Sequence, residues 1–158
     1  MAAKVIDLAD VQNLLAAWWF EYDQGWFDRW ESRFTDDARF TCRSDSGATA
    51  FEEFIRVELS GRDSVLAWQE DHRRNSPYPL RHNVTNVHLV DRRPFEADFR
   101  SYLFVTQVVG GSVANLASGC CTGTVRWEDD QVRFAELLVV LDFTDSVLFS
   151  DALKFDVG

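Results

Sequence analysis

The chain has 158 residues and a formal net charge of −10, and hydrophobic residues make up 46% of it. This length fits one domain over residues 1–158 with a single core. A strongly negative field repels phosphate backbones and anionic lipid surfaces, which argues against nucleic acid and membrane as partners. No run reaches the ~20 apolar residues that a membrane span needs, and the N-terminus has no apolar leader segment, so we expect a cytoplasmic protein.

The first predicted element is a helix. Asp7 is a suitable N-cap, and the helix should end near Asp23-Gln24-Gly25, with Gly25 as the stop. The apolar residues follow the i, i+3, i+4, i+7, i+8, i+11 spacing of one buried helical face, and they are Val11, Leu14, Leu15, Trp18, Trp19 and Tyr22.

The next segments are shorter. A second helix is predicted with Phe27, Trp30 and Phe34 facing inward, after which Asp36 and Asp37 turn the chain. The segments expected after this turn are a strand at 38–43, a polar loop at 44–49, helical spacing from 51 to 61, a further helix at 63–72 and a turn-rich stretch at 75–79.

Beyond Pro79 the pattern changes to strands. Four runs rich in β-branched and aromatic residues are predicted at 80–91, 95–109, 112–127 and 132–143. Short connections between them indicate an antiparallel meander, in which Gly119 and Gly123 would be points of bulging or bending. Helices followed by a run of long strands are typical of the α+β class.

The last strand suggests assembly. Leu137, Val139 and Leu141 would lie on one face and Leu138 and Val140 on the other, although a sheet with one wet face should alternate. We therefore expect a homo-oligomer, a dimer or a trimer, that covers the second face.

Few residue types point to chemistry. The sequence has no phosphate-binding glycine loop, no nucleophile elbow and no metal-spaced cluster, so we expect neither a cofactor nor a metal. The histidines are His72, His82 and His88, and we expect His72 on a solvated helix face. Asp23, at the end of the first helix, either points into a cavity or belongs to the turn that follows.

Three stretches resemble a known family. Residues 21–23 (Glu-Tyr-Asp), 34–38 (Phe-Thr-Asp-Asp-Ala) and 81–86 (Arg-His-Asn-Val-Thr-Asn) look like SnoaL-like proteins of the NTF2-like superfamily. The resemblance extends roughly from Leu8 to Phe143. It implies a cone-like α+β fold, in which a curved antiparallel sheet wraps around the N-terminal helices and encloses an internal pocket.

The resemblance also implies catalytic residues. Asp23 and His82 match the Asp–His pair of scytalone dehydratase and lindane dehydrochlorinase, and Tyr22 matches a tyrosine of the dehydratase. His82 would remove a proton from carbon, Asp23 would orient it, and Tyr22 would donate a hydrogen bond to a carbonyl. The chain reads Phe40-Thr41-Cys42 where the dehydratase has a second tyrosine, shows no clear counterpart to its second histidine, and has Leu137 near the place of the dehydrochlorinase arginine.

The expected activity is a cofactor-independent dehydratase, isomerase or cyclase acting on a small apolar, aromatic or polyketide-like molecule. Two alternatives remain. One is a non-catalytic subunit that resembles the small subunit of aromatic-ring dioxygenases, and the other is a ligand-binding module without turnover. The residues expected to contact the small molecule are Asn86, Trp18, Trp19, Phe40, Phe54, Trp68 and Tyr102.

Overall fold

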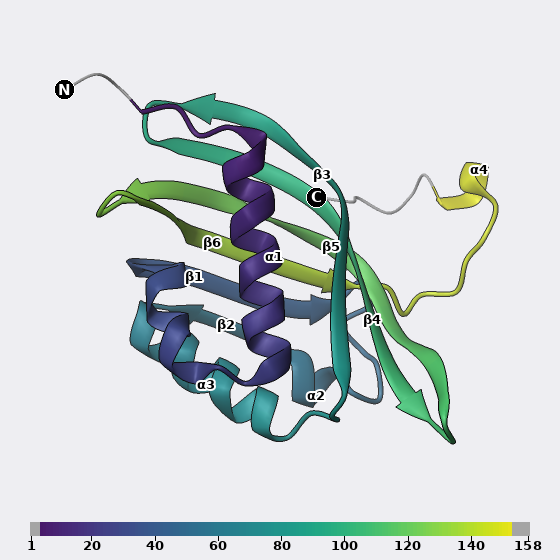
Figure 1. Ribbon diagram of the computed structural model, residues 1–158. Coiled ribbons are helices and arrows are strands. Elements are labelled where there is room, and N and C mark those ends of the chain that lie inside the picture. Colours follow the sequence, from purple (N-terminus) through teal and green to yellow (C-terminus); the bar gives the residue numbers. More distant parts are fainter. Residues whose placement is uncertain (1–3, 153–158) are drawn as a thin grey trace.

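The computed structural model describes residues 4–152, and within them helices lie against one strongly curved sheet (Figure 1). The six strands follow the order β2-β1-β6-β5-β4-β3. The elements are α1 (Leu8–Gln24), η1 (Phe27–Arg33), β1 (Phe34–Ser44), α2 (Glu52–Ile55), β2 (Val57–Ser60), α3 (Arg62–Arg74), β3 (Leu80–Arg93), β4 (Glu96–Val109), β5 (Ser112–Glu128), β6 (Gln131–Leu141) and α4 (Phe149–Ala152).

The limits of α1 confirm the prediction. Asp7 caps the N-terminus, where its carboxylate accepts from the Asp10 backbone N–H at 3.0 Å and the Asp10 carboxylate accepts from the Asp7 N–H at 3.0 Å. Gly25 ends the helix in the left-handed region, at φ 66°, where a side chain would be strained. These two caps fix which residues form the last turn of α1.

The segment between α1 and α3 differs from the prediction. β1 already begins at Phe34, so Asp36 and Asp37 lie within a strand and do not form a turn. The helical spacing at 51–61 is realised only over α2, and Val57–Ser60 forms the edge strand β2, antiparallel to β1. The pairing with β1 satisfies this backbone, which local spacing cannot show.

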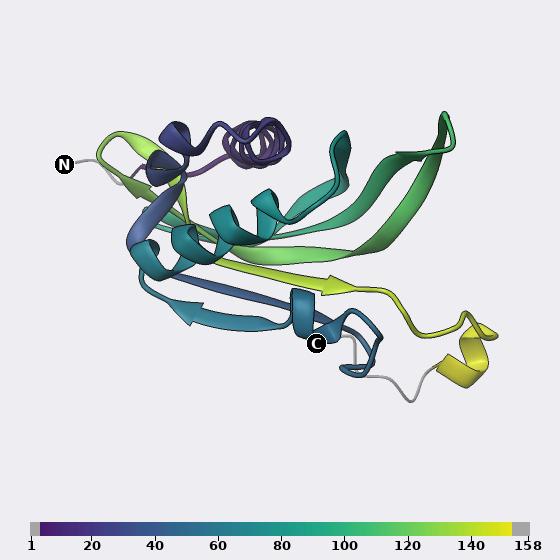
Figure 2. The ribbon, with the colours of Figure 1, turned by 90° about the horizontal axis from the view of Figure 1, so that it is seen from below.

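The sheet is mixed because one pair of strands runs parallel. Strands β3 to β6 form the expected antiparallel meander, whereas β1 lies parallel to β6, with Arg39 opposite Glu136. Gly119 and Gly123 permit close packing of β5 on β6, because a Cβ at Gly123 would lie 2.0 Å from the Glu136 carbonyl oxygen. The curled sheet and the helices on its concave face form an α+β fold (Figure 2).

The core lies between the concave face and the helices. Trp18 and Trp30 from the helical layer are almost fully buried, together with Phe34, Phe99 and Phe134 from the sheet. On the other face, Leu138 and Val140 are only partly buried, and the homo-oligomer that would cover them stays a prediction.

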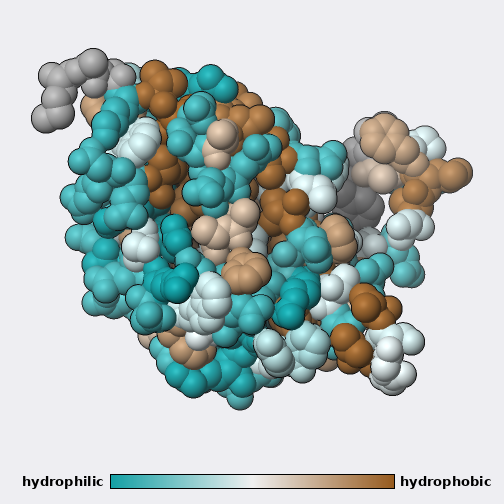
Figure 3. Space-filling model, viewed as in Figure 1, coloured by the Kyte–Doolittle hydropathy of each residue, from teal (hydrophilic) through white to brown (hydrophobic). Residues whose placement is uncertain are grey.

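Some apolar side chains remain exposed. Figure 3 shows them at the tip of the β4–β5 hairpin, where Val109 and Val113 are exposed, and around α4, where Leu148 is exposed. Within residues 4–152, no helix has the length and apolar character needed to cross a membrane.

Candidate active site

The structure brings Asp23 and His82 into direct contact, although 59 residues separate them in the chain. Asp23 Oδ1 lies 2.6 Å from His82 Nδ1, and Asp23 Oδ2 accepts a hydrogen bond from the His82 backbone N–H at 2.8 Å. The carboxylate thus holds both the side chain and the backbone of the third residue of β3. The side chain of Asp23 is 5% exposed and that of His82 is 11% exposed, so the pair is largely shielded from water.

The contact with Asp23 determines which nitrogen of the neutral His82 imidazole carries the proton. A carboxylate accepts hydrogen bonds, so the neutral ring of His82 must carry its proton on Nδ1 and present a lone pair on Nε2. Within residues 4–152, no hydrogen bond is made to this Nε2. The ring is therefore oriented with its basic atom, Nε2, on the side away from the carboxylate.

One face of α1 surrounds His82. Trp19, Tyr22 and Asp23 follow the i, i+3, i+4 spacing, which places them on the same side of a helix. The Trp19 ring stacks on the imidazole at 4.4 Å between centroids and 8° between planes. The Tyr22 ring meets it edge-on at 5.2 Å. The last turn of α1 thus supplies the carboxylate and two of the aromatic walls.

His72 belongs to the same cluster, and the expectation that it lies on a solvated helix face is wrong. Its ring is stacked with Phe54 at 4.4 Å and Trp68 at 4.7 Å, and its Nδ1 lies 2.6 Å from the Tyr22 hydroxyl oxygen. Burial, followed by the nearby charges of His82 and Arg73, lowers the pKa of His72 to about 4. His72 is therefore neutral at pH 7.

The hydroxyl of Tyr22 is occupied by its hydrogen bond to His72. The residue is 2% exposed, and burial raises the pKa of its phenol, so the hydroxyl keeps its proton. Its hydroxyl is hydrogen-bonded to His72 Nδ1, whereas the family resemblance implies a hydrogen bond from this group to a substrate carbonyl.

Arg73 fixes the end of α1, a role that is absent from the predictions made from the sequence. Its Nε donates to the Tyr22 carbonyl at 2.9 Å and its Nη2 to the Asp23 carbonyl at 2.8 Å. Because the last turn of α1 contains no basic residue, this buried guanidinium supplies the positive charge that a helix C-terminus favours. Val65, Gln69 and Arg73 recur every four residues and are all buried, a spacing that identifies Arg73 as an inward residue.

The predicted aromatic contacts divide into two groups. Trp19, Trp68 and Phe54 touch one of the two histidines, and Phe54 is 44% exposed, so it lies at the surface of the cluster. Trp18 is fully buried against Tyr22, and Phe40 packs on Trp68 at 5.5 Å. These last two support the cluster from the core side.

Two of the residues predicted to contact the small molecule lie apart from the cluster. Tyr102 is 58% exposed between the buried residues Ser101 and Leu103, so its ring lies on the face of the sheet opposite to His82. Asn86 is exposed at φ 55°, where the register of β3 shifts against β4. Strand alternation could not place Asn86, because the irregularity after Thr85 changes which residues face inward.

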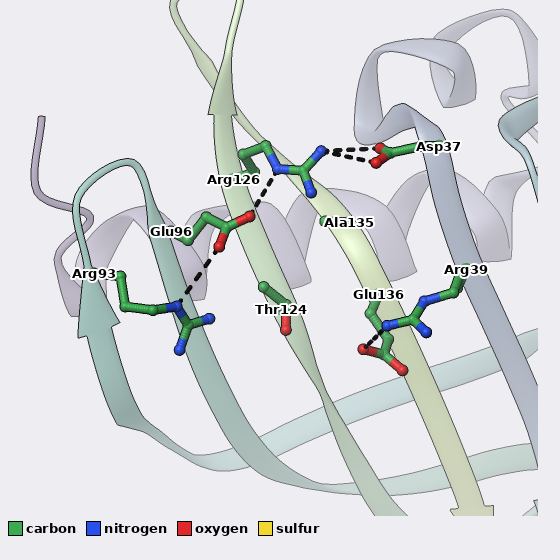
Figure 4. A pocket seen from close by; sticks show the side chains of 8 residues that line it. All are labelled: Asp37, Arg39, Arg93, Glu96, Thr124, Arg126, Ala135 and Glu136. Carbon is green, nitrogen blue, oxygen red and sulfur yellow. Dashed lines mark hydrogen bonds and ion pairs between the residues drawn. The ribbon is translucent and has the colours of Figure 1, made fainter.

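Two hollows of the structure lie away from the Asp23–His82 pair. One of about 390 Å³ lies on the outer face of the sheet, and its charged side chains are mostly paired with each other, such as Arg126 with Asp37 and Glu96 and Arg39 with Glu136 (Figure 4). Exposed pairs of this kind leave little free charge for a ligand. A second hollow, of about 370 Å³, lies beside Phe104 on β4. The apolar pocket over His82 stays a prediction.

In the described part of the chain, no three His, Cys, Asp or Glu side chains are arranged so that they could hold a metal ion. The chemistry available at the candidate site is that of imidazole, carboxylate and phenol.

The sequence matches the model of the SnoaL-like domain over residues 3–137. The chain belongs to the SnoaL-like family. No curated protein matches it. Membership in this family agrees with the fold, in which helices are followed by a curved mixed sheet.

Solved structures share this fold at low identity. A protein of unknown function from Mycobacterium tuberculosis has a TM-score of 0.69 and 21% identity, over 91% of this chain and 74% of that one. A scytalone dehydratase-like protein from Novosphingobium aromaticivorans has a TM-score of 0.69 and 15% identity, over 89% of this chain and 88% of that one. The β subunit of benzoate 1,2-dioxygenase from Burkholderia mallei has a TM-score of 0.67 and 21% identity, over 87% of this chain and 92% of that one.

Proposed function

We propose that this SnoaL-like protein is a cofactor-independent lyase or isomerase that removes a proton from a carbon atom of a small apolar or aromatic substrate. The observation that carries the proposal is the contact between Asp23 and His82, with its 2.6 Å side-chain distance and its 2.8 Å bond to the backbone. A histidine held twice by one buried carboxylate is positioned in the way that general base catalysis requires.

In the proposed reaction, His82 Nε2 takes the proton from a carbon next to a group that can accept negative charge. The imidazolium that forms is stabilised by the carboxylate of Asp23, which lies 5% exposed and therefore acts at low dielectric. The proton then returns either to another atom of the substrate, which completes an isomerisation, or to a departing hydroxyl, which completes a dehydration. Protons balance in both cases, and no redox partner is needed.

The surroundings support an apolar substrate. Trp19 stacks on His82, and Phe54 and Trp68 flank His72, so aromatic surfaces border both imidazoles. Flat apolar molecules are bound favourably by such walls. A scytalone dehydratase-like protein is among the proteins of the same fold, which agrees with a dehydratase.

A probe reaction can test the base without knowledge of the substrate. The ring opening of 5-nitrobenzisoxazole begins with loss of a carbon-bound proton and produces a coloured phenolate. We expect His82→Gln and Asp23→Asn to slow the catalysed reaction by about 10²-fold or more, the usual contribution of a positioned base. His88→Gln is the matched control, because His88 is exposed on the same strand, and its rate should equal that of the wild type.

The result that would contradict the proposal is a wild-type rate no higher than that of His82→Gln under the same conditions. Circular dichroism of each variant would separate a lost base from a lost fold.

A second candidate function is that of a non-catalytic subunit. It is favoured by two β subunits of ring-hydroxylating dioxygenases among the proteins of the same fold, with TM-scores of 0.67 and 0.68. Affinity purification of the tagged chain from its own cells would distinguish the two functions. A large iron–sulfur protein recovered in equal amounts would support the subunit, and recovery of this chain alone would oppose it.

A further inference from the structure

The hydroxyl of Tyr22 is hydrogen-bonded to one nitrogen of His72. The phenol is 2% exposed and its oxygen lies 2.6 Å from His72 Nδ1. A buried O–H needs an acceptor, and the partners of this one are His72 Nδ1, at 2.6 Å, and the side chain of Ser76. With Nδ1 as the acceptor of this O–H, the neutral ring of His72 carries its proton on Nε2.

The Nε2–H of His72 is a donor without an acceptor. The atom is buried, and within residues 4–152 it has no hydrogen-bond partner. Phe54 and Trp68, which stack on the ring, leave it little freedom to turn the group toward water. Leaving a buried donor unpaired is costly, so such an atom in a candidate site indicates an acceptor that arrives with a ligand.

The unpaired donor lies close to the proposed base. The rings of His72 and His82 both neighbour the Tyr22 ring, at centroid distances of 6.5 and 5.2 Å. Trp19, which stacks on His82, also has a buried indole N–H with no partner in the described part of the chain. The unpaired buried donors around Tyr22 in the described part of the chain thus include one beside each histidine, together with the indole N–H groups of Trp18 and Trp30.

We infer that His72 Nε2–H binds an uncharged oxygen acceptor of the substrate, such as a ketone carbonyl, next to the carbon that His82 deprotonates. The inference rests on the proposed function and deepens it, because it names the group that the substrate must present. A neutral imidazole is a suitable partner, since it polarises a carbonyl without adding a positive charge beside the base. His72 then takes the role that the family resemblance gives to Tyr22, and Tyr22 becomes a positioning residue.

A pair of matched ligands tests this assignment. 2-Tetralone and tetralin share one carbon skeleton, and only the former has a carbonyl. We expect the wild type to bind 2-tetralone more tightly than tetralin. His72→Phe, which keeps an aromatic ring, should weaken the binding of 2-tetralone about threefold to tenfold and leave the binding of tetralin unchanged. The same loss of both ligands, or no preference of the wild type for 2-tetralone, would overturn the inference.

A spectroscopic measurement checks the tautomer without any ligand. Long-range ¹H–¹⁵N spectra of the wild type should show His72 protonated on Nε2 at neutral pH, and Tyr22→Phe should remove this preference. A proton found on Nδ1 would overturn the inference. If His72→Phe does not fold, the double variant Tyr22→Phe/His72→Phe leaves no orphaned hydroxyl and should show the same loss of 2-tetralone binding.

The outcomes for the base and for the donor are separable. Loss of proton transfer in His82→Gln together with unchanged 2-tetralone binding in His72→Phe would refute only the donor. A wild-type preference for 2-tetralone that depends on His72, without any effect of His82→Gln on the probe reaction, would refute only the base.

Discussion

Acidification should destabilise the protein through His72. Burial lowers the pKa of this residue from 6.5 to about 4 in the folded state. The unfolded chain therefore binds more protons between these two values, and stability that is present above pH 6.5 is lost as the pH falls toward 4. A shift of this size corresponds to a total on the order of 3 kcal/mol, of which about 2 kcal/mol is lost by pH 5.

The measurement is urea unfolding of the wild type and of His72→Phe at pH 7.5, 6.0 and 5.0. Other titrating groups contribute to both proteins, so the difference between the two free energies of unfolding isolates His72. This difference should move by about 2 kcal/mol in favour of the variant between pH 7.5 and pH 5.0. Parallel pH profiles for the two proteins would refute the burial of a neutral His72.

Two further substitutions test the frame of the site. Arg73→Met removes two charged hydrogen bonds to the end of α1 and should lower the free energy of unfolding in urea by about 3–5 kcal/mol. Arg74→Met, at an exposed ion pair, is the control and should lower it by less than about 1 kcal/mol. Equal losses in the two variants would show that Arg73 does not hold the helix. Gly123→Ala forces a methyl group to within 2.0 Å of the Glu136 carbonyl oxygen and should lower stability by more than about 2 kcal/mol. Thr122→Ala on the same strand is the control. If Gly123→Ala melts at the same temperature as this control, β5 can move away from β6 to make room for the methyl group.

The sequence predicts those parts of the fold that local patterns determine. The apolar spacing and the capping residues Asp7 and Gly25 give α1 closely, and turn signals separate the strands of the meander. β2 escapes prediction because Leu59 also fits the helical spacing of Phe51, Phe54 and Ile55. The parallel pairing of β1 with β6 also lies beyond local patterns, because it depends on contacts between distant segments.

The candidate site is harder to predict from the sequence than the fold. Position alone leaves Asp23 equally suited to a turn, and only the family resemblance pairs it with His82. His72 sits among charged neighbours in the sequence, so its burial becomes visible only when α3 packs beside α1. The irregularity in β3 displaces Asn86, because one shifted residue changes the face on which the following side chains lie, up to the second irregularity after Leu89.

The parallel pairing of β1 with β6 affects how the chain is made. Arg39 and Glu136, which bond across this pair, are 97 residues apart, so β1 leaves the ribosome long before its partner exists. Non-local pairing of this kind slows folding and prolongs the exposure of unpaired edges. The aromatic face of α1 also emerges before β3 and β6 can cover it. We therefore expect nascent chains that stop before Gln131 to aggregate or to be held by chaperones, with Asp23 already synthesised but not yet in the register that places it against His82.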